Sequence, residues 1–107
     1  MSDVVTRGFS ARIGSYFSTF CGTVDVAALA RTEWASVTFC GARHRLGIAL
    51  HGPGAVGAAA DFLADLPELE FEIHGHIVAD VALISEERGD GGFYALLELE
   101  ALTIEEC

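Results

Sequence analysis

Positive charge is scarce in this chain of 107 residues, because six Lys and Arg residues stand against sixteen Asp and Glu residues. The formal charge of −10 and the isoelectric point near 4.5 oppose contact with phosphate backbones and with anionic lipid surfaces. We therefore expect neither nucleic acid nor membrane among the partners of this protein.

Long apolar runs are also missing, although 51% of the residues are hydrophobic and the mean hydropathy is +0.41. No uninterrupted apolar stretch approaches the roughly 18 residues that a membrane-spanning helix needs. The first residues show no basic block followed by an apolar block, which is the pattern of a secretory signal. These features predict a soluble cytoplasmic protein.

Cysteines are few, odd in number and far apart, at Cys21, Cys40 and Cys107. No C-x-x-C pair indicates a zinc site, and an odd set does not make a complete disulfide framework. We therefore expect three free thiols, as is usual in a reducing compartment, and small buried apolar side chains as their commoner role.

Repeats, low-complexity tracts and Pro/Ser-rich linkers are absent, so we expect one domain over residues 1–107. Apolar residues from Val5 to Phe20 recur with the spacing of one helix face, with Ser2 as a candidate N-cap. A second, shorter helix is predicted over VAALAR, residues 26–31. The N-terminal part of the chain is therefore predicted to be helical.

The period of the apolar pattern drops to two after Trp34, which predicts two strands joined by a turn at GARH, residues 41–44. A third helix is expected between Pro53 and Pro67, where small and apolar residues return to helical spacing.

Strands over 70–86 and 93–104, joined by the turn-forming ERGDGG, complete the chain. The expected order is ααββαββ, an α+β domain with a mainly antiparallel four-stranded sheet and helices packed on it.

Alternation along the last two strands predicts two different faces. Ile77, Val81 and Leu83 are expected on the core face. The opposite face combines charged residues with a set of apolar ones: Val78, Ala82, Ile84, Tyr94, Leu96, Leu102 and Ile104. If all helices lie on one side of the sheet, this second face forms an exposed apolar patch of the kind that marks interaction sites. We therefore expect a homodimer, since two-fold dimers are the commonest oligomers.

A metal site is one functional interpretation of the segment EFEIHGHIVADVALI, residues 70–84. His74 and His76, two apart on a strand, can both reach one ion, and His51, Asp80 or a glutamate can complete the ligand set. The commoner alternative is a half-exposed strand face that carries two polar histidines, so no cofactor is expected.

Anion binding is a second interpretation, at Gly52, Gly54 and Gly57, which form G-x-G-x-x-G at a predicted helix start. This spacing is that of dinucleotide-binding turns, but hairpins on both sides leave no length for a doubly wound sheet. A small anion at the helix N-terminus fits better, and ordinary turn formation explains the glycines equally well.

Acid–base chemistry is a third interpretation, because His74 or His76 beside Asp80 or Glu98 makes a carboxylate–imidazole pair. The candidate ligand-binding residues are therefore His51, His74, His76, Asp80, Tyr94 and Glu98. Of these classes we favour a small cytoplasmic, non-enzymatic binding or interaction module, homodimeric through the sheet. The alternative is a metal-binding protein or a small metal-dependent or acid–base enzyme that uses the His-x-His motif.

Overall fold

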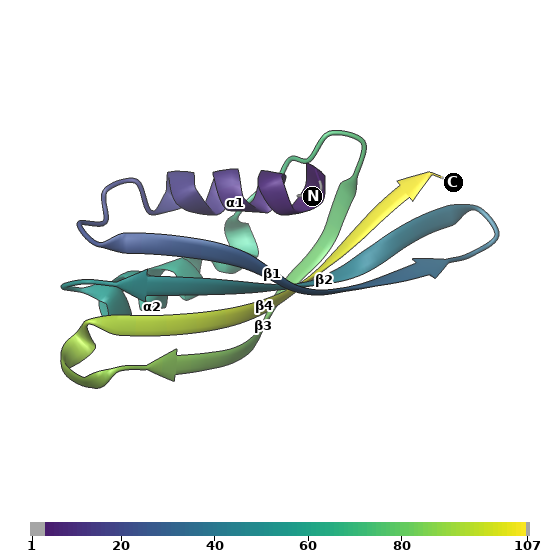
Figure 1. Cartoon of the computed structure of the whole chain (residues 1–107). Coiled ribbons are helices and arrows are strands. Elements are labelled where there is room, and N and C mark those ends of the chain that lie inside the picture. The colour runs from purple at the N-terminus through teal and green to yellow at the C-terminus, as the bar shows by residue number, and fades with distance from the viewer. Residues whose placement is uncertain (1–3, 107) are drawn as a thin grey trace.

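The computed structural model describes residues 4–106 as two α-helices on a four-stranded antiparallel sheet (Figure 1). In chain order the elements are α1 (Val4–Tyr16), β1 (Thr23–Ala35), β2 (Phe39–His51), α2 (Ala55–Asp65), η1 (Leu66–Glu68), β3 (Ile77–Arg88), η2 (Asp90–Gly92) and β4 (Tyr94–Glu106). The sheet order is β1-β2-β4-β3, with every neighbouring pair antiparallel. The expected α+β class and antiparallel sheet are confirmed.

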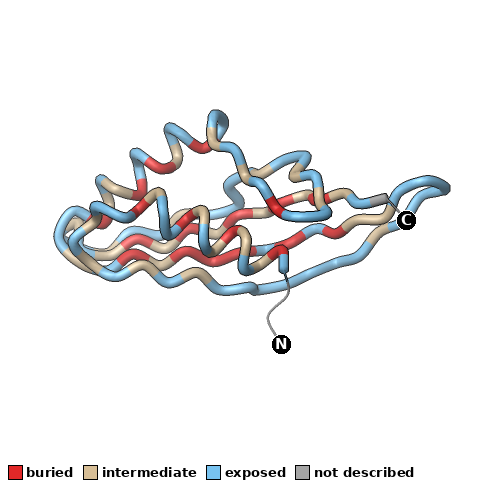
Figure 2. The backbone as a smooth tube through the Cα atoms, turned by 90° about the horizontal axis from the view of Figure 1, so that it is seen from above, coloured by how far each residue is buried: buried red, intermediate tan, exposed pale blue. Residues whose placement is uncertain are grey.

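Both α-helices cover the same face of the sheet. Val5, Phe9 and Ile13 form the buried face of α1, as the helical spacing of the sequence predicted. Buried residues of α2 join the same core, and the Phe17 and Phe62 rings lie 5.2 Å apart. Figure 2 shows the buried segments along the inner strands and on the two helices. Ser2, the candidate N-cap, lies outside the described residues.

The predicted helix over residues 26–31 is wrong, because this segment belongs to β1. Ala, Leu and Arg are among the best helix formers, but pairing of the whole segment with β2 overrides that preference. Val24 and Val26 alternate with exposed residues and pack against the core, which is the period of a strand.

The predicted turn at residues 41–44 is also wrong, because these residues lie inside β2. The chain reverses instead around Ser36, whose backbone N–H donates to the Phe39 carbonyl at 2.7 Å. Ala42 and His44 are buried on the helix side, and His44 Nε2 lies 3.0 Å from Thr103 Oγ1. Arg43 points to the other side. Partners far along the chain hold this segment extended, and the local sequence does not show them.

The strand predicted over residues 70–86 starts later, at Ile77. Residues 73–76 form a tight turn in which the His76 N–H donates to the Ile73 carbonyl at 3.0 Å. Gly75 has a φ of 81°, a conformation that an L side chain disfavours, so His74-Gly75-His76 curls instead of extending. The assumption that both histidines share one strand face is therefore wrong.

Bulges interrupt both edge strands. β1 carries an extra residue between Ala28 and Ala30, and β3 carries one between Val78 and Asp80 and another between Leu83 and Ser85. Because each extra residue reverses the alternation, Val78 packs on the core while Ile77 is 65% exposed. The expected core position of Ile77 and the expected outward position of Val78 are both wrong for this reason.

The distal ends of β1, β2 and β4 extend beyond the helices (Figure 1). The radius of gyration is 14.3 Å, and the principal extents are 50 × 28 × 22 Å. A compact chain of this length has a radius of gyration of about 13 Å. Neither α-helix in residues 4–106 is long and apolar enough to cross a membrane.

The cysteines differ in their oxidation state. Cys21 is free and exposed, whereas Cys40 on β2 is disulfide-bonded. The expectation of three free thiols is therefore wrong for Cys40. Cys107 lies outside the described residues.

Alkylation of the unfolded, unreduced protein tests the state of these two thiols. We expect mass spectrometry to find Cys21 modified and Cys40 unmodified until a reductant is added. Quantitative labelling of Cys40 before reduction would show that the disulfide is absent under the conditions of purification.

The two helices are joined by one polar contact at their adjacent ends. Tyr16 Oη donates to Asp65 Oδ2 at 2.7 Å. Burial of the phenol, with the hydrogen bond and charge of Asp65, raises the pKa of Tyr16 to about 12. The neutral phenol is therefore the form that the folded protein stabilises.

The change Tyr16→Phe tests this contact. At neutral pH we expect the free energy of unfolding to fall by about 1 kcal/mol, the usual net value of one hydrogen bond. The unfolded phenol ionises near pH 10. The contribution of Tyr16 is therefore complete below about pH 10, and in the wild type it falls as the pH rises towards the folded pKa of about 12. Urea unfolding across this range should show that alkaline loss in the wild type and not in the variant; identical pH profiles would contradict it.

Candidate functional site

The face of the sheet opposite the helices, here called the open face, is not covered by either α-helix of the described residues (Figure 1). Ala95, Leu97, Leu99 and Ala101 of β4 point into the helix-covered core. The alternate residues of β4 therefore point to the open face, and so do the residues that pair with them. Its residues on the inner strands are Gly41, Arg43, Arg45, Gly47, Ala49 and His51 of β2 and Tyr94, Leu96, Glu98, Glu100, Leu102 and Ile104 of β4.

Two rows of opposite charge occupy the centre of the open face. Arg43 Nη1 lies 3.4 Å from Glu100 Oε1, and Arg45 Nη1 lies 3.4 Å from Glu98 Oε2. A longer contact of 3.8 Å joins Arg45 Nε to Glu100 Oε2. The four charges sum to zero in a chain whose formal charge is −10. Solvent screens such half-exposed pairs, so their main effect is to neutralise the centre of this face.

Apolar side chains surround the charged centre. Leu29 is the extra residue of the β1 bulge, is 52% exposed, and lies over Gly47. Ile77 and Ile84 of β3 are 65% and 43% exposed. Trp34 lies against Gly41, where an added Cβ would meet the indole ring at 2.5 Å. The open face therefore combines a neutral polar centre with an apolar surround, which is unlike a fully solvated sheet surface.

The edges of the sheet are poorly suited to further strand pairing, since β1 and β3 both carry bulges and β2 and β4 do not. Bulges interrupt the regular row of backbone donors and acceptors that another strand would need. The open face is thus better suited to association than the edges are.

The candidate ligand-binding residues lie at opposite ends of the sheet. The His51 and Tyr94 rings contact one another at 4.9 Å between centroids, where β2 ends and β4 begins. His76 precedes Ile77, which pairs with Ile104 near the other end of β4. Tyr94 and Ile104 are ten positions apart on β4, a distance of about 33 Å. Glu98 lies between them and pairs with Arg45. These residues do not form one site.

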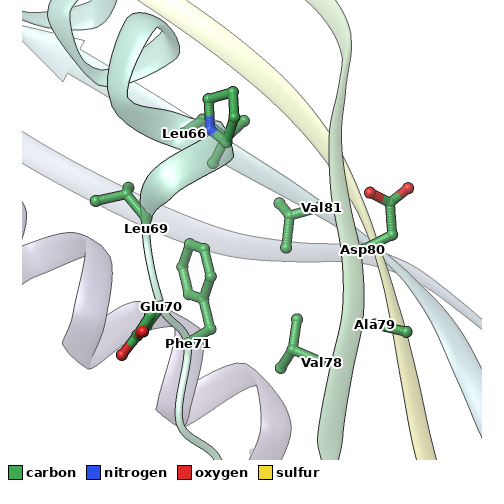
Figure 3. A pocket seen from close by; sticks show the side chains of 9 residues that line it. Leu66, Leu69, Glu70, Phe71, Val78, Ala79, Asp80 and Val81 are labelled. Atoms are coloured by element: carbon green, nitrogen blue, oxygen red, sulfur yellow. The ribbon is translucent and has the colours of Figure 1, made fainter.

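His76 contacts Glu105 rather than the predicted acids. Its Nε2 lies 3.3 Å from Glu105 Oε2, and its Nδ1 lies 3.1 Å from the His74 carbonyl oxygen. Asp80 is exposed in the β3 bulge and points away from Val78 and Val81 (Figure 3). Within residues 4–106, no three His, Cys, Asp or Glu side chains come close enough to hold one ion.

The glycines at residues 52–57 form the connection between β2 and α2. Gly52 has a φ of 135°, and a Cβ there would lie 2.9 Å from the Gly22 Cα. The chain crosses itself at this point, which requires two residues without side chains. Gly54 precedes α2 as its N-cap, without a side-chain cap. Turn formation accounts for Gly52, whereas Gly57 meets no neighbouring atom that would require a glycine.

A cleft of about 340 Å³ lies on the helix side, between the segment after η1 and the first bulge of β3. Phe71, Val78 and Val81 face one another across it, with Leu66 at one end (Figure 3). Glu70 and Asp80 point away from this apolar space. The cleft therefore offers apolar contact without converging polar groups, which specific small-molecule sites usually have.

Sequence reasoning missed the two arginines as site residues, because residues 41–44 were expected to be a solvated hairpin tip. It also missed Leu29 and Trp34, since one was assigned to a helix and the other was expected only to precede a strand. The exact alternation of Arg43 and Arg45 with His44 was the one available signal of a strand there.

Comparison with known protein families, curated proteins and solved structures finds no significant match to this chain.

Metal analysis of protein purified without a histidine tag tests the His-x-His interpretation. We expect well under one equivalent of zinc, nickel or iron per chain, because the described histidines and acids do not converge. About one equivalent per chain, lost when His74 and His76 are both changed to Ala, would establish a metal site.

Proposed function

We propose that this protein is a small interaction module that acts as a homodimer through the open face. The observation that carries the proposal is the placement of both helices on the other face, which leaves the apolar surround of Leu29, Ile77 and Ile84 uncovered. A second layer over the open face removes these side chains from water.

The size of the open face supports this proposal. Four strands spaced about 4.8 Å apart and paired over about 33 Å present about 600 Å² in projection. Each partner in a standard protein interface buries about 800 Å² of accessible surface. The accessible surface of a patch is larger than its projected area, because side chains stand out from it. A projected area of about 600 Å² is therefore of the standard size. Each large apolar side chain that becomes buried contributes about 1.5–3 kcal/mol before the costs of association. A few such side chains are enough for a micromolar dimer.

A metal-binding or acid–base function is the second candidate, and the contact between His76 and Glu105 supports it. A carboxylate beside an imidazole orients the ring. In the described residues, however, this pair lies at the turn before β3 and away from His51 and Glu98. The open face therefore remains the better candidate.

Cytoplasmic location remains part of the proposal. The two described cysteines favour different compartments. A free, exposed Cys21 is typical of a reducing compartment, whereas a disulfide at Cys40 is rare there. The alkylation experiment, repeated on protein trapped in intact cells, separates these alternatives.

The changes Leu96→Glu and Leu102→Glu test the dimer. Each adds a charge to the open face without opening a hole in the core, since both side chains are only partly buried. We expect light scattering at micromolar concentration to give about twice the chain mass of 11.3 kDa for the wild type and a shift towards 11.3 kDa for each variant. Added salt should tighten the wild-type dimer by screening the repulsion between two chains of charge −10.

Leu83→Glu is the matched control, because Leu83 is 42% exposed but pairs with Leu99 on the helix side. It should leave the dimer intact. A monomeric wild type, or equal effects of Leu83→Glu and Leu96→Glu, would refute the open face as the interface.

A further inference from the structure

We infer that the dimer, whose existence rests on the proposed function, has its two-fold axis parallel to the strands and between β2 and β4, so that each arginine row faces the partner's glutamate row. The inference comes from the arrangement of charge on the open face. The basic row lies wholly on β2 and the acidic row wholly on β4.

Face-to-face packing of two copies permits two simple orientations of a two-fold axis in the interface plane. Residues that pair across neighbouring strands are here said to be at the same level. An axis along the strands places β2 over β4 of the partner and β1 over β3 of the partner, and it keeps each residue at its own level along the sheet. An axis across the strands places every strand over its own copy and reverses the levels. The sheet order β1-β2-β4-β3 is symmetric about the line between β2 and β4, so both orientations superimpose the whole sheet.

The charges distinguish the two orientations. With the axis along the strands, Arg45 lies over the partner's Glu100, because these residues are at the same level. With the axis across the strands at the level of Arg45 and Glu100, each of these two charges lies over its own copy. Juxtaposed like charges in a desolvated interface cost several kcal/mol, so the first orientation is favoured.

The apolar surround matches in the same orientation. Ala30, level with Arg45, comes over Ala82 of the partner, which is level with Glu100. Trp34 comes over Ile77 of the partner, since both are level with Ile104 and Gly41. The charges therefore select this axis, and the contact between Trp34 and Ile77 of the partner is compatible with it.

At the neighbouring levels Arg43 comes over Leu102 of the partner and Glu98 comes over Gly47 of the partner, so Arg45 and Glu100 make the direct charge contact. Ala49 comes over Leu96 of the partner, and Thr32 comes over Asp80. At one end, Asp25 comes over Glu87 of the partner, which is a repulsive contact between two exposed carboxylates. Because the interface is self-complementary, it closes after two copies and gives no filament.

Exchange of the two charged rows is the decisive experiment. The row-swapped chain carries Arg43→Glu, Arg45→Glu, Glu98→Arg and Glu100→Arg. It keeps the formal charge of −10 and the opposite signs on neighbouring strands, so its fold has the same cross-strand pairing as the wild type. An isotope-labelled wild type is mixed with it at equal concentration, and native mass spectrometry counts the three dimers. A mixture of labelled and unlabelled wild type is the control for subunit exchange.

With the axis along the strands, both chains form homodimers, and the mixed dimer falls about tenfold below the statistical half, because like rows then face each other. With the axis across the strands, the mixed dimer is preferred instead. A statistical or preferred mixed dimer therefore overturns the inference while leaving the proposed dimer in place. If the wild type is monomeric, the proposed function itself fails. A row-swapped chain that folds by circular dichroism but stays monomeric also overturns the inference.

A distance measurement keeps the inference testable if the row-swapped chain does not fold. Val37 is fully exposed at the end of the β1–β2 hairpin, one extreme of a molecule 50 Å long. A spin label at Val37→Cys, in a chain with Cys21→Ser, reports the separation of the two hairpin tips in the dimer. The axis along the strands places both tips at the same end, well under 50 Å apart. A separation of 50 Å or more would place them at opposite ends and overturn the inference.

Discussion

Alternation of side chains along β2 and β4 is the constraint on which the rest of the molecule depends. These inner strands are hydrogen-bonded on both sides and carry no bulge, so each of their residues points strictly to one face. Leu46, Ile48, Leu97 and Leu99 make one face a core that two helices cover. The same period sends Arg43, Arg45, Glu98 and Glu100 to the opposite face. Core and candidate interface are thus two consequences of a single strand register.

The sequence predicted those features of the fold that depend on neighbouring residues. The α1 stripe, the helix between Pro53 and Pro67 and the last hairpin follow from local spacing and turn residues, and the structure contains all three. It did not predict β1, because Ala and Leu at residues 27–30 favour a helix until β2 pairs with them. It also placed Ile77 in the core, because a bulge has no reliable local signature and reverses every position beyond it.

The candidate site was predicted only in part, for a related reason. The apolar outward residues of β4, such as Leu96 and Leu102, were visible in the alternation of one strand. The charged centre was not, because it needs the register that brings Arg45 beside Glu100 across 55 residues of chain. The spacing of His74 and His76 places both side chains on one face only if these residues form a strand. They form a turn at Gly75 instead.

The bulges of the edge strands make a substitution and a deletion in β3 differ in their effect on the edge of the sheet. A substitution at Ala79 or Ile84 leaves the extra residue in place and keeps the edge irregular. Loss of both codons would bring β3 into continuous register with β4 and straighten the outer row of backbone amides and carbonyls. A straight edge beside exposed apolar residues is a template on which further chains can add as strands. In this protein, deletion of both extra residues of β3 is therefore the change expected to favour fibril growth.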